Sequence, residues 1–173
     1  MDIKKLLSAL PTYNDKPQNN KNIPYPHLQI ISGKTGSGKT YLLFQQLLTP
    51  NFLDYDELYV LSPNINVKEY QFLKLGFQHN LSKSAMLHLF SILDKFRTKD
   101  LNDIIEYYKH ELPEHETNNY IKALFTNKQN DLPTISEMDE VKQKWFIFDD
   151  LAGEKEYYDI IKKLFSKGRP NNC

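Results

Sequence analysis

The feature that most constrains this chain is a glycine-rich segment that follows a short apolar run. Residues 33–40 read Gly-Lys-Thr-Gly-Ser-Gly-Lys-Thr, which matches the pattern G-x-x-x-x-G-K-T, and residues 28–32 before them read Leu-Gln-Ile-Ile-Ser. Glycines let the backbone turn tightly and bring successive N–H groups close to a phosphate. The apolar spacing after Thr40 predicts a helix whose N-terminus faces that phosphate. The order of strand, loop and helix therefore predicts a nucleoside triphosphate site.

The residues of this loop have roles that follow from their chemistry. Lys39 is predicted to reach the β- and γ-phosphates, and Thr40 to place its hydroxyl on Mg²⁺. The other loop positions are predicted to line the ATP phosphates: Gly33, Thr35, Gly36, Ser37 and Gly38. The alternative is a glycine-rich surface turn, against which the flanking strand and helix patterns argue.

A second motif lies near the end of the chain, where an apolar run precedes two acids. Residues 145–148 read Trp-Phe-Ile-Phe, which is typical of a buried strand, and Asp149 and Asp150 follow directly. Asp149 is predicted to hold Mg²⁺, directly or through water. Asp150 is predicted to orient the attacking water, although it is one methylene shorter than the usual glutamate. The alternative is a solvent-facing pair of acids at the end of a strand.

The rest of the sequence predicts an α/β fold with a parallel sheet flanked by helices. Residues 58–62 predict a second strand, and residues 154–167 an amphipathic helix capped by Gly168. Residues 1–26 are predicted to be a flexible lead-in, and 27–173 the ATPase domain.

The long middle segment, residues 66–140, is predicted to be a mostly helical insertion. Apolar residues three and four apart predict helices in four places: 67–75, 84–96, 100–110 and 117–128. An alternative within the second of these is a strand over residues 86–91.

Composition excludes several classes of protein. The 173 residues include 22 Lys and Arg and 22 Asp and Glu, so the chain has no overall positive charge that would indicate nucleic-acid binding. The content is 40% hydrophobic and 13% aromatic, which is too rich for a disordered chain. The single cysteine, Cys173, excludes an internal disulfide. No signal peptide or membrane-spanning run is visible, so we expect a soluble, intracellular protein with no membrane partner.

Four blocks of sequence carry a resemblance to a known family: residues 32–40, 58–63, 147–151 (Ile-Phe-Asp-Asp-Leu) and 164–169 (Leu-Phe-Ser-Lys-Gly-Arg). With them the chain resembles the genome-packaging ATPases of the HerA/FtsK superfamily, found in poxviruses, other large DNA viruses and Maverick/Polinton-like elements. The blocks together comprise 26 of the 173 residues. The phosphate loop is generic, and the Phe-Asp-Asp-Leu block with its following helix and Lys-Gly-Arg is more specific.

The resemblance implies a P-loop NTPase fold and an ATP-driven motor that works as a homo-oligomeric ring on double-stranded DNA. It implies a location in the host cytoplasm or nucleus, or in the virion. Arg169 falls in the family's Gly-Arg-His block, where it would act catalytically on phosphate charge in its own or a neighbouring site. Pro170 stands where the family usually has histidine.

The family continues beyond the equivalent of Cys173 into a strand that carries a polar sensor residue. The resemblance therefore implies a C-terminally truncated product that lacks C-terminal strands, binds nucleotide weakly and hydrolyses it poorly. Two other hypotheses stay open. One is a small-molecule P-loop kinase whose lid comes from residues 66–140, where Arg97 is the only arginine. The other is an inactive remnant that only binds nucleotide.

Overall fold

The computed structural model describes residues 3–8, 29–34, 36–151 and 155–167. These residues form an α/β fold that divides into two compact units. The loop unit comprises Met1–Asp54 and Leu75–Asn119, and the sheet unit comprises Tyr55–Lys74 and Tyr120–Cys173. Residues 9–26 of the predicted lead-in lie outside the described residues, and Ile3–Leu7 form helix α1.

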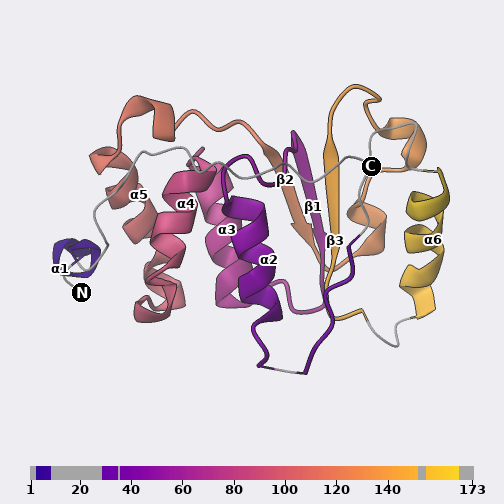
Figure 1. Ribbon diagram of the computed structural model, residues 1–173, viewed down its shortest axis with the longest axis horizontal. Coiled ribbons are helices and arrows are strands. Elements are labelled where there is room, and N and C mark those ends of the chain that lie inside the picture. The colour runs from indigo at the N-terminus through magenta and orange to yellow at the C-terminus, as the bar shows by residue number, and fades with distance from the viewer. Residues whose placement is uncertain (1–2, 9–28, 35, 152–154, 168–173) are drawn as a thin grey trace. The chain divides into compact units, whose positions relative to one another are not determined.

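The sheet unit is built on a parallel sheet in the order β2-β1-β3 (Figure 1). Strand β1 spans Glu57–Leu61, β2 spans Lys122–Thr126 and β3 spans Lys144–Phe148. The central strand is buried along its whole length, as expected for a parallel strand paired on both edges. The strands predicted over residues 58–62 and 145–148 are therefore confirmed, and the parallel sheet with them.

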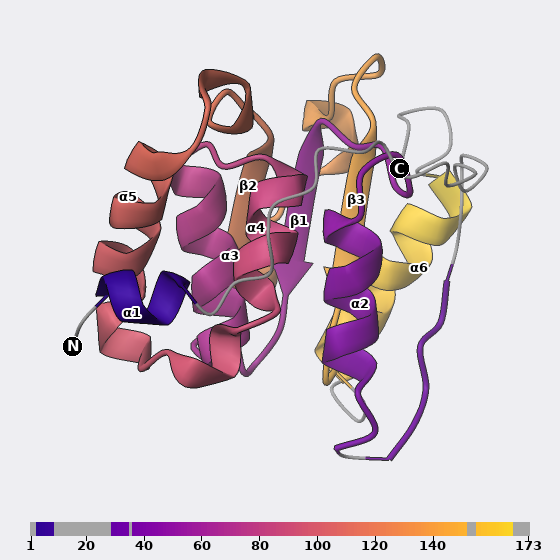
Figure 2. The ribbon, with the colours of Figure 1, turned by 60° about the vertical axis from the view of Figure 1, so that its left-hand side comes forward.

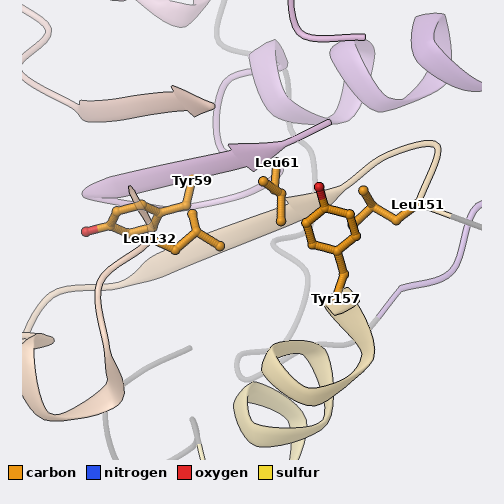
Figure 3. Packing of buried hydrophobic residues seen from close by; sticks show 5 residues of the cluster. All are labelled: Tyr59, Leu61, Leu132, Leu151 and Tyr157. Carbon is orange, nitrogen blue, oxygen red and sulfur yellow. The ribbon is translucent and has the colours of Figure 1, made fainter. Parts of the chain in front are cut away.

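One face of this sheet is covered by helix α6, Tyr158–Lys167, and by the 3₁₀ turn η6 before it, Lys155–Tyr157. Figure 3 shows Tyr157 pointing toward Leu61 of β1 and Leu151, which follows β3. The buried cluster also contains Tyr59 and Leu132. Apolar residues at helical spacing thus meet the strands, which confirms the helix predicted over residues 154–167 for the part that the structure describes. Glu154 and Gly168 lie outside that part.

The connection from β2 to β3 passes through two 3₁₀ turns, η4 (Gln129–Asp131) and η5 (Ile135–Glu137). A capping box holds η5, in which Thr134 and Glu137 exchange side-chain and backbone hydrogen bonds. Leu132 between the turns reaches the core of the sheet unit. The crossover is thus held by Leu132 and the capping box, together with the buried Met138 and the hydrogen bond from the Thr126 hydroxyl to Asp131.

The regular elements described in the loop unit are all helices or 3₁₀ turns. It contains α2 (Lys39–Leu48), α4 (Lys83–Phe90) and α5 (Leu101–Glu111), together with α1 and the turns η1 (Leu93–Lys95), η2 (Thr98–Asp100) and η3 (Glu114–Glu116). Helix α1 lies beside α5 (Figure 2). Helix α2 packs on α4, where the ring centroids of Phe44 and Phe90 lie 5.1 Å apart. Helix α3, Lys68–Gln78, runs from the sheet unit into the loop unit.

Two expectations about these elements are wrong. A strand is predicted before the loop over residues 28–32, but residues 29–32 are irregular and Ile30 is 83% exposed, while Leu28 lies outside the described residues. Residues 117–128 are not a helix, because Lys122–Thr126 pair with β1. Within residues 84–96 the expected helix is confirmed over the alternative strand at 86–91, since most of these residues lie in α4. Short apolar runs fit either period, and pairing with a neighbouring strand decides between them.

The remaining helix predictions hold with shifted ends. Helices predicted over 67–75 and 100–110 correspond to α3 and α5, and the one predicted over 84–96 ends at Phe90 and continues as η1. Residues 66–140 are therefore helical up to η3 and then include β2. Among the described helices, none has the length and apolar character to cross a bilayer.

Ser82 offers a test of the loop unit. Its hydroxyl caps α4 by accepting from the Ala85 backbone at 3.0 Å, and it also donates to the buried Glu116. Replacing Ser82 with alanine removes both bonds, so we expect the free energy of unfolding to fall by about 2 kcal/mol in urea titrations. Ser84→Ala, within the same helix, should change it by less than about 0.5 kcal/mol. Equal effects of the two substitutions would contradict the capping role.

Candidate functional site

The phosphate loop in the loop unit has the backbone that its glycines predict. Gly36 and Gly38 have φ angles of 76° and 84°, in the left-handed region that disfavours other residues. The Ser37 N–H donates to the Lys34 carbonyl at 3.1 Å. A Cβ on Gly33 would lie 2.6 Å from the Ser37 hydroxyl oxygen, which would have to rotate away. At Gly36 and Gly38 a Cβ would have no neighbour within 4 Å, so the positive φ angles alone favour glycine there.

The side chain of Lys39 folds back over this loop. Its ammonium donates to the carbonyl oxygens of Gly33 and Lys34, each at 3.0 Å. Helix α2 begins at Lys39 after Gly38, whose lack of a side chain leaves the first turn without a side-chain cap. Thr40 lies half-buried in that first turn. A cation and the positive end of a helix thus occur together, as an anion site requires.

The acidic pair in the sheet unit stands at the carboxyl edge of the parallel sheet. The backbone N–H of Asp149 donates to the Leu61 carbonyl at 3.1 Å, which extends the pairing of β3 with β1 by one residue. Asp150 then turns away with φ 56°, an uncommon left-handed conformation for a residue other than glycine. Ligands of open parallel sheets bind at this edge, and unusual backbone angles cluster at functional sites.

Each acid has a polar partner from the segment after β1. The Tyr70 hydroxyl donates to Oδ2 of Asp149 at 2.6 Å, and the Asn64 side-chain amide donates to Oδ2 of Asp150 at 3.2 Å. Burial, the hydrogen bond to Asp149 and the nearby carboxylates raise the pKa of Tyr70 above its ordinary value. The phenol therefore stays a hydrogen-bond donor at neutral pH.

Sequence reasoning missed Asn64 and Tyr70. Asn64 carried a weak signal, because it belongs to a Ser-Pro-Asn turn directly after a strand that ends at the same edge. Tyr70 carried none, since its place in α3 fits ordinary apolar spacing. Only the fold reveals that the two residues meet the acids.

The side chains of each unit can be matched to the groups of a magnesium–triphosphate complex. In the loop unit, Lys39 and the backbone N–H groups can donate to phosphate oxygens, and Thr40 carries a hydroxyl oxygen. In the sheet unit, Asp149 carries a carboxylate, the type of hard oxygen ligand that Mg²⁺ prefers. Mg²⁺ commonly takes one or two protein oxygens and completes its shell with phosphate and water. Over the described ranges there is no cluster of three or more His, Cys, Asp or Glu side chains arranged for a metal ion. Such a cluster is not needed for this mode of binding.

The predicted site residues fall into three groups. Gly33, Gly36, Ser37, Gly38, Lys39 and Thr40 come together in the loop unit, and Asp149 and Asp150 in the sheet unit. Thr35 and Arg169 lie outside the described residues, as does Pro170. The structure therefore describes the glycine-rich loop in one unit and the acidic pair in the other.

The backbone at Asp150 yields a stability prediction. Alanine at this position keeps the left-handed strain and loses the bond to Asn64, whereas glycine loses the bond but relieves the strain. We expect Asp150→Gly to be more stable than Asp150→Ala by about 1 kcal/mol in urea unfolding. At Asp139, an exposed acid without a positive φ, alanine should be at least as stable as glycine. The reverse order at Asp150 would show that its backbone is unstrained.

Comparison with known proteins adds no assignment to this geometry. No family model, curated protein or solved structure matches the chain. The resemblance to genome-packaging ATPases therefore stays a prediction, and statements about function depend on the residues described above.

Proposed function

We propose that the chain is a P-loop protein that binds ATP with Mg²⁺ and hydrolyses it slowly, and that it is related in mechanism to motors that couple ATP hydrolysis to the movement of double-stranded DNA. The observation that carries the proposal is the position of Lys39 across the glycine turn, 3.0 Å from two of its carbonyl oxygens. Nothing in a simple surface turn requires a lysine at the start of a helix to fold back over the loop. Binding of a triphosphate at that place does require a cation there.

The proposed roles follow from side-chain chemistry. Lys39 and the backbone N–H groups of the loop hold the β- and γ-phosphates, and Thr40 and Asp149 supply oxygens to Mg²⁺. When bound, the metal neutralises negative charge on the phosphates. Asp150 accepts a proton from the attacking water or orients it, and Asn64 steadies that carboxylate. Arg169 is proposed to stabilise phosphate charge during transfer.

The ion pair that Arg97 makes with Asp100 favours hydrolysis of ATP over transfer of phosphate to a small acceptor. A kinase lid needs arginines that can close over phosphates, and Arg97 is the only arginine of residues 66–140. Its guanidinium instead pairs with Asp100, three residues along the chain. The resemblance implies that the partner is double-stranded DNA and that copies of the chain assemble into a homo-oligomeric ring.

Nucleotide binding is the first test. We expect Lys39→Ala to weaken binding of Mg-ATP to the full chain at least tenfold, about 1.4 kcal/mol, because it removes the cation that faces the phosphates. Isothermal titration calorimetry or a fluorescent ATP analogue would measure this. The matched control is Lys34→Ala, which removes an exposed lysine of the same loop and should change the affinity less than about threefold. Unchanged affinity in Lys39→Ala would refute the proposed site.

Turnover is the second test. We expect slow phosphate release from ATP without any acceptor, stimulated by duplex DNA, and lowered about 100-fold in Asp150→Asn with ATP binding retained. Asp139→Asn, which alters an exposed acid of the same unit, should leave the rate unchanged. Transfer that depends on a small acceptor would favour the kinase hypothesis. Tight binding without turnover would favour the remnant that only binds nucleotide.

A further inference from the structure

Tyr70 has a buried phenol that none of the proposed catalytic roles uses. Its side chain is 2% exposed and comes from α3, and its hydroxyl donates to Oδ2 of Asp149, 79 positions away in the sequence, at 2.6 Å. Hydrogen bonds to a charged carboxylate are shorter and stronger than those between neutral groups. The contact therefore fixes one oxygen of the acid that is proposed to serve the metal.

We propose that Tyr70 is a positioning residue for Asp149, whose Oδ2 it holds so that Oδ1 is left to bind the divalent cation. This inference rests on the proposed function, because it assigns Asp149 to the metal. It names a residue that the phosphate-loop and acidic-pair motifs do not contain.

Two anchors at different points of Asp149 support this role. The backbone N–H is tied to Leu61 of the central strand, and the carboxylate is tied to the phenol. A tyrosine ring has few rotatable bonds, and packing on all sides leaves the hydroxyl little freedom. Partners of this kind orient metal ligands in proteins, and their removal typically costs 10- to 100-fold in metal affinity.

A purely structural bond between a phenol and a carboxylate also occurs in the same sheet. Tyr59, which is 4% exposed, donates to Oε2 of the buried Glu57 at 2.7 Å. Glu57 begins β1, at the end of the sheet opposite to Asp149. Tyr59 thus resembles Tyr70 in its burial, in donating to a carboxylate and in the length of that hydrogen bond. The carboxylate belongs to Glu57 rather than to Asp149.

The test is the Mg²⁺ dependence of ATP binding to the full chain. We expect Tyr70→Phe to raise the Mg²⁺ concentration needed for half-maximal binding at least tenfold, while ATP affinity in EDTA stays unchanged. With Mn²⁺ in place of Mg²⁺, electron paramagnetic resonance should show weaker retention of the ion. In an Asp149→Asn background, Tyr70→Phe should have no further effect on either measurement.

Tyr59→Phe is the control, because it deletes an equally buried hydroxyl and should leave the Mg²⁺ dependence unchanged. An unchanged Mg²⁺ dependence in Tyr70→Phe, or an equal change in both variants, would overturn the positioning role and leave ATP binding intact. A parent chain that binds ATP without any Mg²⁺ dependence would also overturn it. A parent chain that fails to bind ATP would refute the proposed function and this inference together.

Discussion

The pairing of β1 with a parallel strand on each edge is the constraint on which the sheet unit depends. It buries all of β1 and brings the carboxyl ends of the three strands to one edge. The pairing continues past the strands, since Ser62 donates to the Thr126 carbonyl and Asp149 to that of Leu61. The acidic pair thus owes its position to backbone hydrogen bonds, and its side chains remain available for polar partners.

The glycine-rich loop depends on local forces instead. Its shape comes from two glycines with positive φ and from hydrogen bonds that join Lys39 to carbonyls five and six residues earlier. Interactions over so short a span are encoded in a short motif, so the sequence was sufficient to predict the turn and the helix after it. Strands β1 and β3 and helix α6 could also be predicted, because their apolar residues follow a strand or helix pattern, although the pairing of the strands is long-range.

Other parts of the fold could not be predicted because long-range pairing decides them. Residues 122–126, Lys-Ala-Leu-Phe-Thr, fit a helix as well as a strand until β1 is placed beside them. Residues 29–32 fit a strand, yet they lie in an irregular segment. Tyr70 and Asn64 become visible only when the fold carries them to the acids, across 79 and 86 positions of sequence. A motif search cannot find such partners, since neither residue has a fixed spacing from Asp149.

The two acids differ in how firmly they are held, and this difference fits their proposed roles. Tyr70 is buried, so its bond to the half-buried Asp149 is shielded from competing water. Asn64 and Asp150 are both exposed, and their longer bond of 3.2 Å competes with solvent. A metal ligand gains from a fixed geometry, whereas a group that orients a water must adjust as the reaction proceeds. Asp149, which is held firmly, thus directly precedes Asp150, which is held less firmly and has a left-handed backbone conformation.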